Sequence, residues 1–143
     1  MDICCRSQKK AQIKKSISYM REPIRDPQRL EHIIKAIDCC FRFADGNTLE
    51  ELDEKSMLYY ALVKNIEIVG EASYMLSLDF KNAHPKTDWR SITAMRHVLV
   101  YDYYMISKRR VWSVVQNDLP PLRKQVVEYL KEFEATEGRS EGN

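Results

Sequence analysis

The side chains best suited to chemistry gather in one stretch of the chain, residues 88–104, which reads DWRSITAMRHVLVYDYY. It places Arg96 beside His97 and follows them with three tyrosines, two of which are Tyr101 and Tyr103. A guanidinium group stays charged and fits phosphate oxygens, whereas an imidazole gains and loses a proton near neutral pH. Side chains of these types could therefore bind a phosphate and move a proton beside it.

Helical spacing indicates which of these side chains could act together. Residues seven apart lie on one face of a helix, which groups Arg96 with Tyr103. His97 shares a different face with Tyr101 and Tyr104. Two interpretations stay open, because aromatic residues at this spacing commonly pack in a core and a helical arginine is commonly solvated. The pattern alone is compatible with a functional site and with ordinary packing.

The remaining ionisable side chains carry weaker signals. His32 is expected on the surface of a helix, and His84 in a loop before a proline. Glu67 and Glu71 are four residues apart on a predicted helix, a spacing that fits a solvated or dimer-facing surface as well as a pair of catalytic carboxylates. The sequence contains no glycine-rich loop of the kind that binds phosphates.

The four cysteines form two adjacent pairs, Cys4–Cys5 and Cys39–Cys40. Neither pair has the Cys-x-x-Cys spacing of zinc sites or redox dithiols, so no metal and no cofactor are expected. A disulfide between Cys4 and Cys39 is the alternative to free thiols, which are the default in the cytoplasm. Cys39 and Cys40 are predicted to pack inside the fold.

Hydrophobic periodicity predicts the helices that must position residues 88–104. Asp26 and Pro27 are typical of a helix start, as cap and first helical residue, and this helix is expected to end near residues 45–47. Its apolar residues recur three and four positions apart: Leu30, Ile33, Ile34, Ile37 and Phe41.

A second helix, about 25 to 30 residues long, is predicted over residues 49–79, because one apolar stripe continues through them. Gly70 lies inside this helix, although glycine is less favourable there than alanine by about 1 kcal/mol. A neighbouring helix backbone that comes too close for any side chain would explain it. Gly70 therefore predicts a close helix crossing.

A third helix is predicted from Asp88 to about Ile106. Asn117 and Asp118, followed by Pro120 and Pro121, are typical of a helix start and predict a final helix. Four apolar stripes joined by short connections can be buried together in a bundle. The predicted fold class is all-α, an antiparallel four-helix bundle with short extra helices.

Composition and charge restrict the function classes. The 143 residues include 44% hydrophobic side chains, enough for one packed domain. Residues 1–19 carry five basic side chains and one acidic one, whereas the remaining 124 residues carry 18 basic and 20 acidic side chains. A slightly acidic body argues against nonspecific nucleic-acid binding, so DNA is not an expected partner.

Three segments are expected along the chain. Residues 1–19 form a weakly ordered basic extension, residues 20–136 the helical domain, and residues 137–143 a polar tail. Met20 is an alternative start of the natural protein. No apolar run reaches the roughly 18 residues that a membrane span needs, and the first residues do not read as a signal peptide, so we expect a cytoplasmic protein without membrane contact.

Several runs of the sequence together resemble the HepT-like branch of the HEPN superfamily over residues 20–130. They are REPIRDPQRLEHIIKAID, ALVKNIEIVGEAS, HPKTDWRSITAMRHVLVYDYY and VWSVVQNDLPPLRKQV, in the family's order. The resemblance implies a HEPN-like homodimer with a metal-independent ribonuclease site of the pattern Arg, four residues, His, any residue, Tyr. Arg96 and Tyr103 match the ends of this pattern, Tyr101 occupies the histidine position, and His97 matches the polar residue after the arginine.

The resemblance also implies a biological role, that of a toxin in a toxin–antitoxin system. Such a toxin cleaves RNA and is silenced when an MntA-like nucleotidyltransferase antitoxin adds AMP to the tyrosine that corresponds to Tyr103. Tyr101 is expected to weaken cleavage, because a phenol with a pKa near 10 supplies little base at neutral pH. The alternative is a non-catalytic helical dimer that binds nucleotide or RNA, or that scaffolds a nucleotidyltransferase.

Overall fold

The computed structural model describes residues 25–53, 56–101 and 107–140. All regular structure in this part of the chain is helical and none of it is strand, which confirms the all-α prediction. The elements in order are α2 (Asp26–Ala44), α3 (Met57–Met75), α4 (Leu78–Ala83), α5 (Trp89–Tyr101), α6 (Lys108–Ser113), the π-helical turn η1 (Val114–Asp118) and α7 (Leu119–Ser140). The predicted basic extension and Met20 lie outside the described residues.

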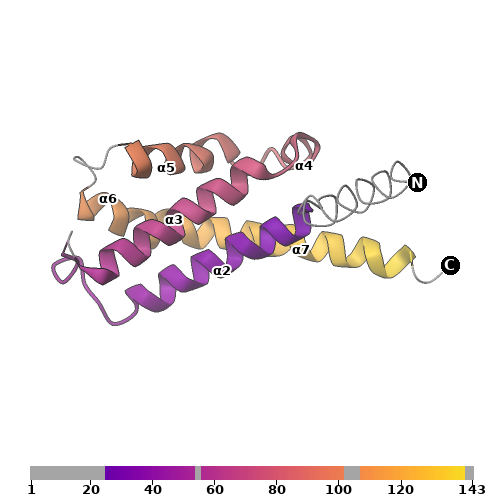
Figure 1. The fold of residues 1–143 in the computed structure, drawn as a ribbon. Coiled ribbons are helices and arrows are strands. Elements are labelled where there is room, and N and C mark those ends of the chain that lie inside the picture. Colours follow the sequence, from indigo (N-terminus) through magenta and orange to yellow (C-terminus); the bar gives the residue numbers. More distant parts are fainter. Residues whose placement is uncertain (1–24, 54–55, 102–106, 141–143) are drawn as a thin grey trace, which may run out of the picture.

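Four long helical stretches alternate in direction to make the bundle. α2 and α5 run one way, while α3 and the stretch from α6 through α7 run the other (Figure 1). α3 packs against both α2 and α5, and α7 packs against α2. The structure is therefore an antiparallel helical bundle with α4 as a short extra helix. Because α5 lies on α3, contacts with α3 decide how the residues of α5 are presented.

The start of α2 is tied to the start of α4. Asp26 was expected to cap α2 but is its first residue, and the backbone amide of Arg25 instead donates to the side chain of Gln28 at 3.0 Å. The carboxylate of Asp26 accepts hydrogen bonds from the amide and hydroxyl of Ser77 at 2.9 and 2.6 Å. The predicted helix is confirmed, and its first carboxylate joins two distant segments.

The predicted helix over residues 49–79 is too long at both ends. Ser56 caps α3 by accepting a hydrogen bond from the amide of Tyr59, and Ser77 caps α4 in the same way. A serine that caps a helix takes an extended backbone, which ends any helix that precedes it. The apolar Leu52 is buried from a turn instead of from a helix.

The last helix begins earlier than predicted. Ser107 caps α6, and helical backbone then continues through η1 into α7 without the restart expected at residues 117–118. Pro120 and Pro121 cannot donate to the carbonyls four residues before them, and their rings crowd those carbonyls. The chain accommodates them by widening one turn, in which the amide of Leu119 bonds the carbonyl of Val114.

The polar segment at the C-terminus is helical where the structure describes it. α7 remains helical to Ser140, so most of the predicted tail over residues 137–143 continues that helix, and residues 141–143 lie outside the described part. The side chains from Glu134 to Arg139 are exposed. This end of α7 therefore projects beyond the packed bundle (Figure 1).

The core follows the predicted apolar stripes. α2, α3 and the α6–α7 stretch all contribute fully buried residues, among them Leu30, Ile33, Ile37, Leu62, Ile66, Val69, Val111, Leu119 and Val126. An aromatic cluster closes the end of the bundle near α4, made by Phe80, His84, Trp89, Tyr129 and Phe133. Among the described helices, none has the length and hydrophobicity needed to cross a membrane.

The cysteine pair on α2 packs as predicted. Cys39 and Cys40 are both free thiols, and Cys40 is fully buried. Burial, with a smaller contribution from Cys39, raises the pKa of the Cys40 thiol to about 12. At neutral pH Cys40 therefore behaves as a small apolar side chain.

Candidate active site on helix α5

Helices α3 and α5 cross in contact at Gly70. A Cβ atom built on Gly70 would lie 2.8 Å from the Cβ of Arg96, 3.1 Å from its amide nitrogen and 3.2 Å from its Cα. No side chain larger than hydrogen fits between backbones at these separations. The close crossing that Gly70 predicts is confirmed, and it places the backbone of Arg96 directly on α3.

The side chain of Arg96 is held by two neighbours on α3. Its Nη1 donates to Oε2 of Glu71 at 2.6 Å, and its guanidinium lies over the ring of Tyr74, 4.1 Å from the ring centroid. Only 17% of the Arg96 side chain is exposed. A cation over an aromatic face gains about 0.5–2 kcal/mol, and an ion pair with a half-exposed carboxylate up to about 1 kcal/mol. The guanidinium is thus oriented, not solvated.

Glu71 and Tyr74 were missed as site residues by the sequence analysis. Glu71 had been interpreted together with Glu67 as one of two helical carboxylates, without an assigned partner. For Tyr74 a signal was available in Gly70, because residues four apart lie on one face of a helix and Gly70 marks the face that meets a neighbour. Glu71 is one residue after Gly70, about 100° around the helix, and the sequence carried no signal for its pairing with Arg96.

The start of α5 is fixed by its predicted cap. Asp88 accepts hydrogen bonds from the amide of Ser91 at 3.1 Å and from its hydroxyl at 2.6 Å. These bonds from Ser91, with a smaller contribution from the charge of Arg90, hold the pKa of the Asp88 carboxyl below its usual value. Asp88 stays ionised at neutral pH and anchors the helix that carries Arg96.

The other predicted site residues lie at the far end of α5. Tyr101 is the last residue of the helix and His97 lies one turn before it, but their side chains are outside the described part of the structure. Tyr103 lies wholly outside the described residues. Of the predicted site residues, the described part thus places the side chain of Arg96, with Glu71 and Tyr74 as its partners.

The histidines that are described have different settings. His84 lies in the loop after α4, as predicted, where its Nδ1 lies 2.9 Å from the carbonyl of Phe80 and its Nε2 lies 2.9 Å from Glu132. Its ring also packs on Phe80 and Tyr129 at centroid distances of 4.3 Å. These contacts indicate a structural role. His32 is exposed on α2, as predicted.

An apolar surface runs along α3 beside the Arg96 contact. It consists of the exposed side chains Met57, Tyr60, Ile68, Tyr74, Met75 and Leu78, the last at the start of α4. A hollow of about 240 Å³ opens on it, lined by Arg29, His32, Ile68, Glu71, Ala72 and Met75. Glu71 therefore pairs with Arg96 and also lines an apolar hollow on the α2 side of the same surface.

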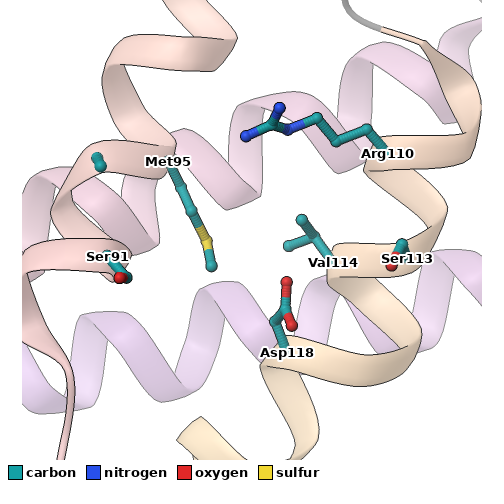
Figure 2. Close-up of a pocket in the computed structure, with 7 residues that line it drawn as sticks. Ser91, Met95, Arg110, Ser113, Val114 and Asp118 are labelled. Carbon is teal, nitrogen blue, oxygen red and sulfur yellow. The ribbon is translucent and has the colours of Figure 1, made fainter.

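A larger hollow of about 500 Å³ lies between α5 and the stretch from α6 into η1. Figure 2 shows Ser91 and Met95 on one side and Arg110, Ser113, Val114 and Asp118 on the other. Arg96 itself does not line it. α5 thus has two chemically different sides, one that binds α3 through Arg96 and one that borders this hollow.

The described residues offer no resident metal site. No group of three or more histidine, cysteine, aspartate or glutamate side chains within residues 25–53, 56–101 and 107–140 is arranged to hold a metal ion. What the described site can offer a substrate is a fixed guanidinium beside a carboxylate. Such a group suits binding of a phosphate and stabilisation of developing negative charge.

Comparison with known proteins identifies the family. The model of the family described as "HepT-like: Ribonuclease HepT-like" matches residues 33–129. The "Putative RNase TTE0752" of Caldanaerobacter subterraneus subsp. tengcongensis is 32% identical over 71% of this chain and 91% of its own length. The "Probable ribonuclease HepT" of Thermococcus cleftensis is 33% identical over 66% of this chain and 86% of its own length.

A third relative gives the same result. The "Putative RNase MJ1380" of Methanocaldococcus jannaschii is 28% identical over 68% of this chain and 89% of its own length. No solved structure matches significantly. The matched segment contains the crossing at Gly70, the arginine held by Glu71 and Tyr74, and the π-helical turn. With an all-α bundle and a match over two thirds of its length, this chain belongs to the HepT-like ribonuclease family.

Proposed function

We propose that this protein is a metal-independent endoribonuclease of the HepT type that acts on RNA in the cytoplasm. Arg96 is the residue proposed to bind the scissile phosphate, and Tyr101 takes the place of the general acid–base residue. The observation that carries the proposal is the restrained guanidinium of Arg96, held by Glu71 and Tyr74 on the helix that the family pattern occupies.

RNA can be cleaved without a metal through its own 2'-hydroxyl. A base removes the hydroxyl proton, the 2'-oxygen attacks phosphorus, and the bond to the 5'-oxygen breaks as that oxygen receives a proton. The products are a 2',3'-cyclic phosphate and a 5'-hydroxyl. Arg96 is proposed to stabilise the negative charge that grows on the phosphate oxygens during this step, where a fixed charged donor is most effective.

Tyr101 is proposed to weaken the reaction. A phenol with an ordinary pKa near 10 is almost fully protonated at neutral pH, so it is a poor base at the moment the 2'-hydroxyl must lose its proton. Loss of general acid–base catalysis typically costs about 100- to 10,000-fold in rate. His97 lies four residues before Tyr101 and is proposed to support the site as the polar residue after the arginine.

A homodimer is part of the proposal. The exposed apolar side chains along α3 adjoin the Arg96–Glu71 pair, so a second copy that covers them would bring two Arg96 side chains to one groove. Ile68→Glu would place a charge on this surface, and light scattering should then report a monomer. Lys124→Glu, on an exposed position of α7, is the control and should leave the dimer intact.

Neutralisation is proposed to act through Tyr103. An MntA-like nucleotidyltransferase antitoxin would add AMP to its hydroxyl, and the added phosphate would repel RNA from the groove by charge and bulk. Co-expression with that enzyme should increase the intact mass by multiples of one AMP group. Tyr103→Phe should abolish the increase, and an unchanged gain in this variant would contradict the assignment.

RNA cleavage by the purified protein tests the proposed activity. Tyr101→His should raise the cleavage rate by about 100- to 10,000-fold, because it restores a base that titrates near neutral pH. Arg96→Ala in that background should lower it by about 100- to 1,000-fold. Arg90→Ala removes an exposed arginine of the same helix and should change little. If Arg96→Ala cuts as well as its parent, another site is responsible.

The second candidate function is a non-catalytic subunit. Tyr101 at the family's histidine position favours it, since a dimer that only binds RNA or nucleotide, or scaffolds a nucleotidyltransferase, needs Arg96 but no base. This function predicts that Tyr101→His gains no cleavage although RNA binding still depends on Arg96. The same set of variants therefore separates the two functions.

A further inference from the structure

The larger hollow on α5 has opposite charges that do not neutralise each other. Arg110 and Asp118 both line it, yet no ion pair joins them. Figure 2 shows the guanidinium of Arg110 extended across the opening and the carboxylate of Asp118 directed into it. Two charges of opposite sign that face one cavity without meeting leave room for a ligand that has both an anionic group and a hydrogen-bond donor.

The wall between these charges is apolar. Met95, half-buried on α5, lies across the hollow from Val114, which is buried at the start of η1. A flexible thioether beside a branched aliphatic side chain suits contact with a flat ring. Ser91 and Ser113 also line the hollow, and the Ser91 hydroxyl, which donates to Asp88, can still accept a hydrogen bond from a ribose hydroxyl.

The π-helical turn η1 supplies one side of this hollow. Val114 and Asp118 are the first and last residues of η1, whose widened turn follows from the two prolines after it. Val114 is buried in the core and Asp118 is exposed, and both line the hollow, so this turn supplies one apolar side chain and one carboxylate to it.

We propose that this hollow binds one nucleotide of an RNA chain. Arg110 pairs with its phosphate, Asp118 accepts a hydrogen bond from a ribose hydroxyl or a base N–H, and Met95 packs with Val114 against the base. A cavity of about 500 Å³ is within the usual range for small-ligand sites, about 300–1,000 Å³. The inference rests on the proposed function in that it takes RNA as the ligand.

The position of the hollow relates it to the candidate active site. Ala94 also lines it, and positions 94 and 101 are seven residues apart in α5, which places them on one side of that helix. A nucleotide in the hollow would therefore lie on the same side of α5 as position 101, about two helical turns before it, and on a different side of the helix from Arg96. It would hold a nucleotide neighbouring the scissile phosphate, so it would contribute to RNA affinity and base preference.

Nucleotide binding can be measured without any cleavage. In the full-length protein labelled with 13C at its methionine methyl groups, nucleoside 3'-monophosphates should shift the signal of Met95, identified by its loss in Met95→Leu. Met57 and Met75 lie on the α3 surface and should not shift. Arg110→Gln should weaken binding by about 10- to 100-fold, the usual effect of losing a charged hydrogen bond. Arg109→Gln, an exposed neighbour that does not line the hollow, should bind as before.

Several outcomes of the same titration would overturn the proposal. An unshifted Met95 signal with all four nucleotides does so, as does equal weakening by Arg109→Gln and Arg110→Gln. Equal shifts with inorganic phosphate and with nucleotides would show that the hollow does not recognise the nucleoside. The titration measures binding and not cleavage, so the two proposals can fail separately. If Arg96→Ala leaves RNA cleavage unchanged while nucleotides still shift the Met95 signal, the proposed activity of Arg96 is contradicted and the nucleotide site in the hollow is supported.

Discussion

Gly70→Ala tests the helix crossing that positions the candidate site. The new methyl group would lie 2.8 Å from the Cβ of Arg96 and 3.1 Å from its amide nitrogen. Alanine is intrinsically better than glycine inside a helix by about 1 kcal/mol. Overpacking a buried contact costs about 1–3 kcal/mol. The atoms in the way belong to the α5 backbone and its first side-chain carbon and cannot rotate aside, so the cost should lie in the upper part of that range.

The expected net result is a loss of about 1–2 kcal/mol in the free energy of unfolding, from the difference between the overpacking cost and the propensity gain. For a chain of this length that corresponds to a melting temperature lower by about 3–8 °C. Thermal and urea denaturation followed by circular dichroism measure it. Gly138→Ala is the matched control, because Gly138 lies in the exposed end of α7 and no atom would meet its Cβ within 4 Å.

The control should be neutral or slightly stabilising, since it gains helix propensity without a clash. If Gly70→Ala is as stable as Gly138→Ala, a Cβ on residue 70 does not come within 2.8 Å of the Cβ of Arg96. The close crossing of α3 and α5, and the position of Arg96 inferred from it, would then be wrong. The separation of the helices should also loosen Arg96 from Glu71 and Tyr74. RNA binding by Gly70→Ala should therefore fall at temperatures where the variant is still fully folded.

Three further predictions concern Glu71, Cys40 and Asp88. Glu71→Gln should lower the free energy of unfolding by less than about 1 kcal/mol, because the carboxylate is 55% exposed, and should strengthen RNA binding at low salt, measured by fluorescence anisotropy. Cys40 should resist alkylation in the native protein at pH 8, because its pKa of about 12 keeps it a thiol. Cys39, whose side chain is only half-buried, should be alkylated before Cys40, as peptide mapping would show. The pKa of Asp88 is lower in the folded than in the unfolded protein, so its stabilisation is complete above the unfolded value near 4 and is lost as the pH falls through the folded value. In thermal melts the stability advantage of the parent over Ser91→Ala should therefore shrink as the pH falls below about 4, and a constant difference would contradict the role of that hydrogen bond.

Much of the fold could be predicted from local pattern. The apolar stripe of α2 and the residues that begin and end it indicate a helix from local sequence alone, and the structure places that helix at Asp26–Ala44. Gly70 carried information about a distant contact, because a glycine in the middle of a helix is unfavourable unless another backbone comes close. The boundaries of α3 could not be predicted as well, since apolar residues such as Leu52 can be buried from a turn as well as from a helix.

The candidate site was predictable only in part. Arg96 could be identified from its family pattern, but its partners Glu71 and Tyr74 belong to a different helix, 25 and 22 residues earlier in the chain. The hollow lined by Arg110 and Asp118 also combines residues of two segments, and its shape depends on a widened turn that helical periodicity does not describe. Side-chain partnerships of this kind require the relative placement of helices.

The sequence by itself determined that this chain is helical and which faces of its helices are buried, because these properties depend on residue type and on spacing along a single helix. Its resemblance to a known family indicated Arg96 as the arginine of the site. Tertiary structure alone decided what holds that arginine and where a cavity forms beside its helix. Both depend on distances of a few ångströms between segments far apart in the chain. Such distances are set by how the whole bundle packs, and apart from the close crossing that Gly70 indicated, no local pattern encodes them.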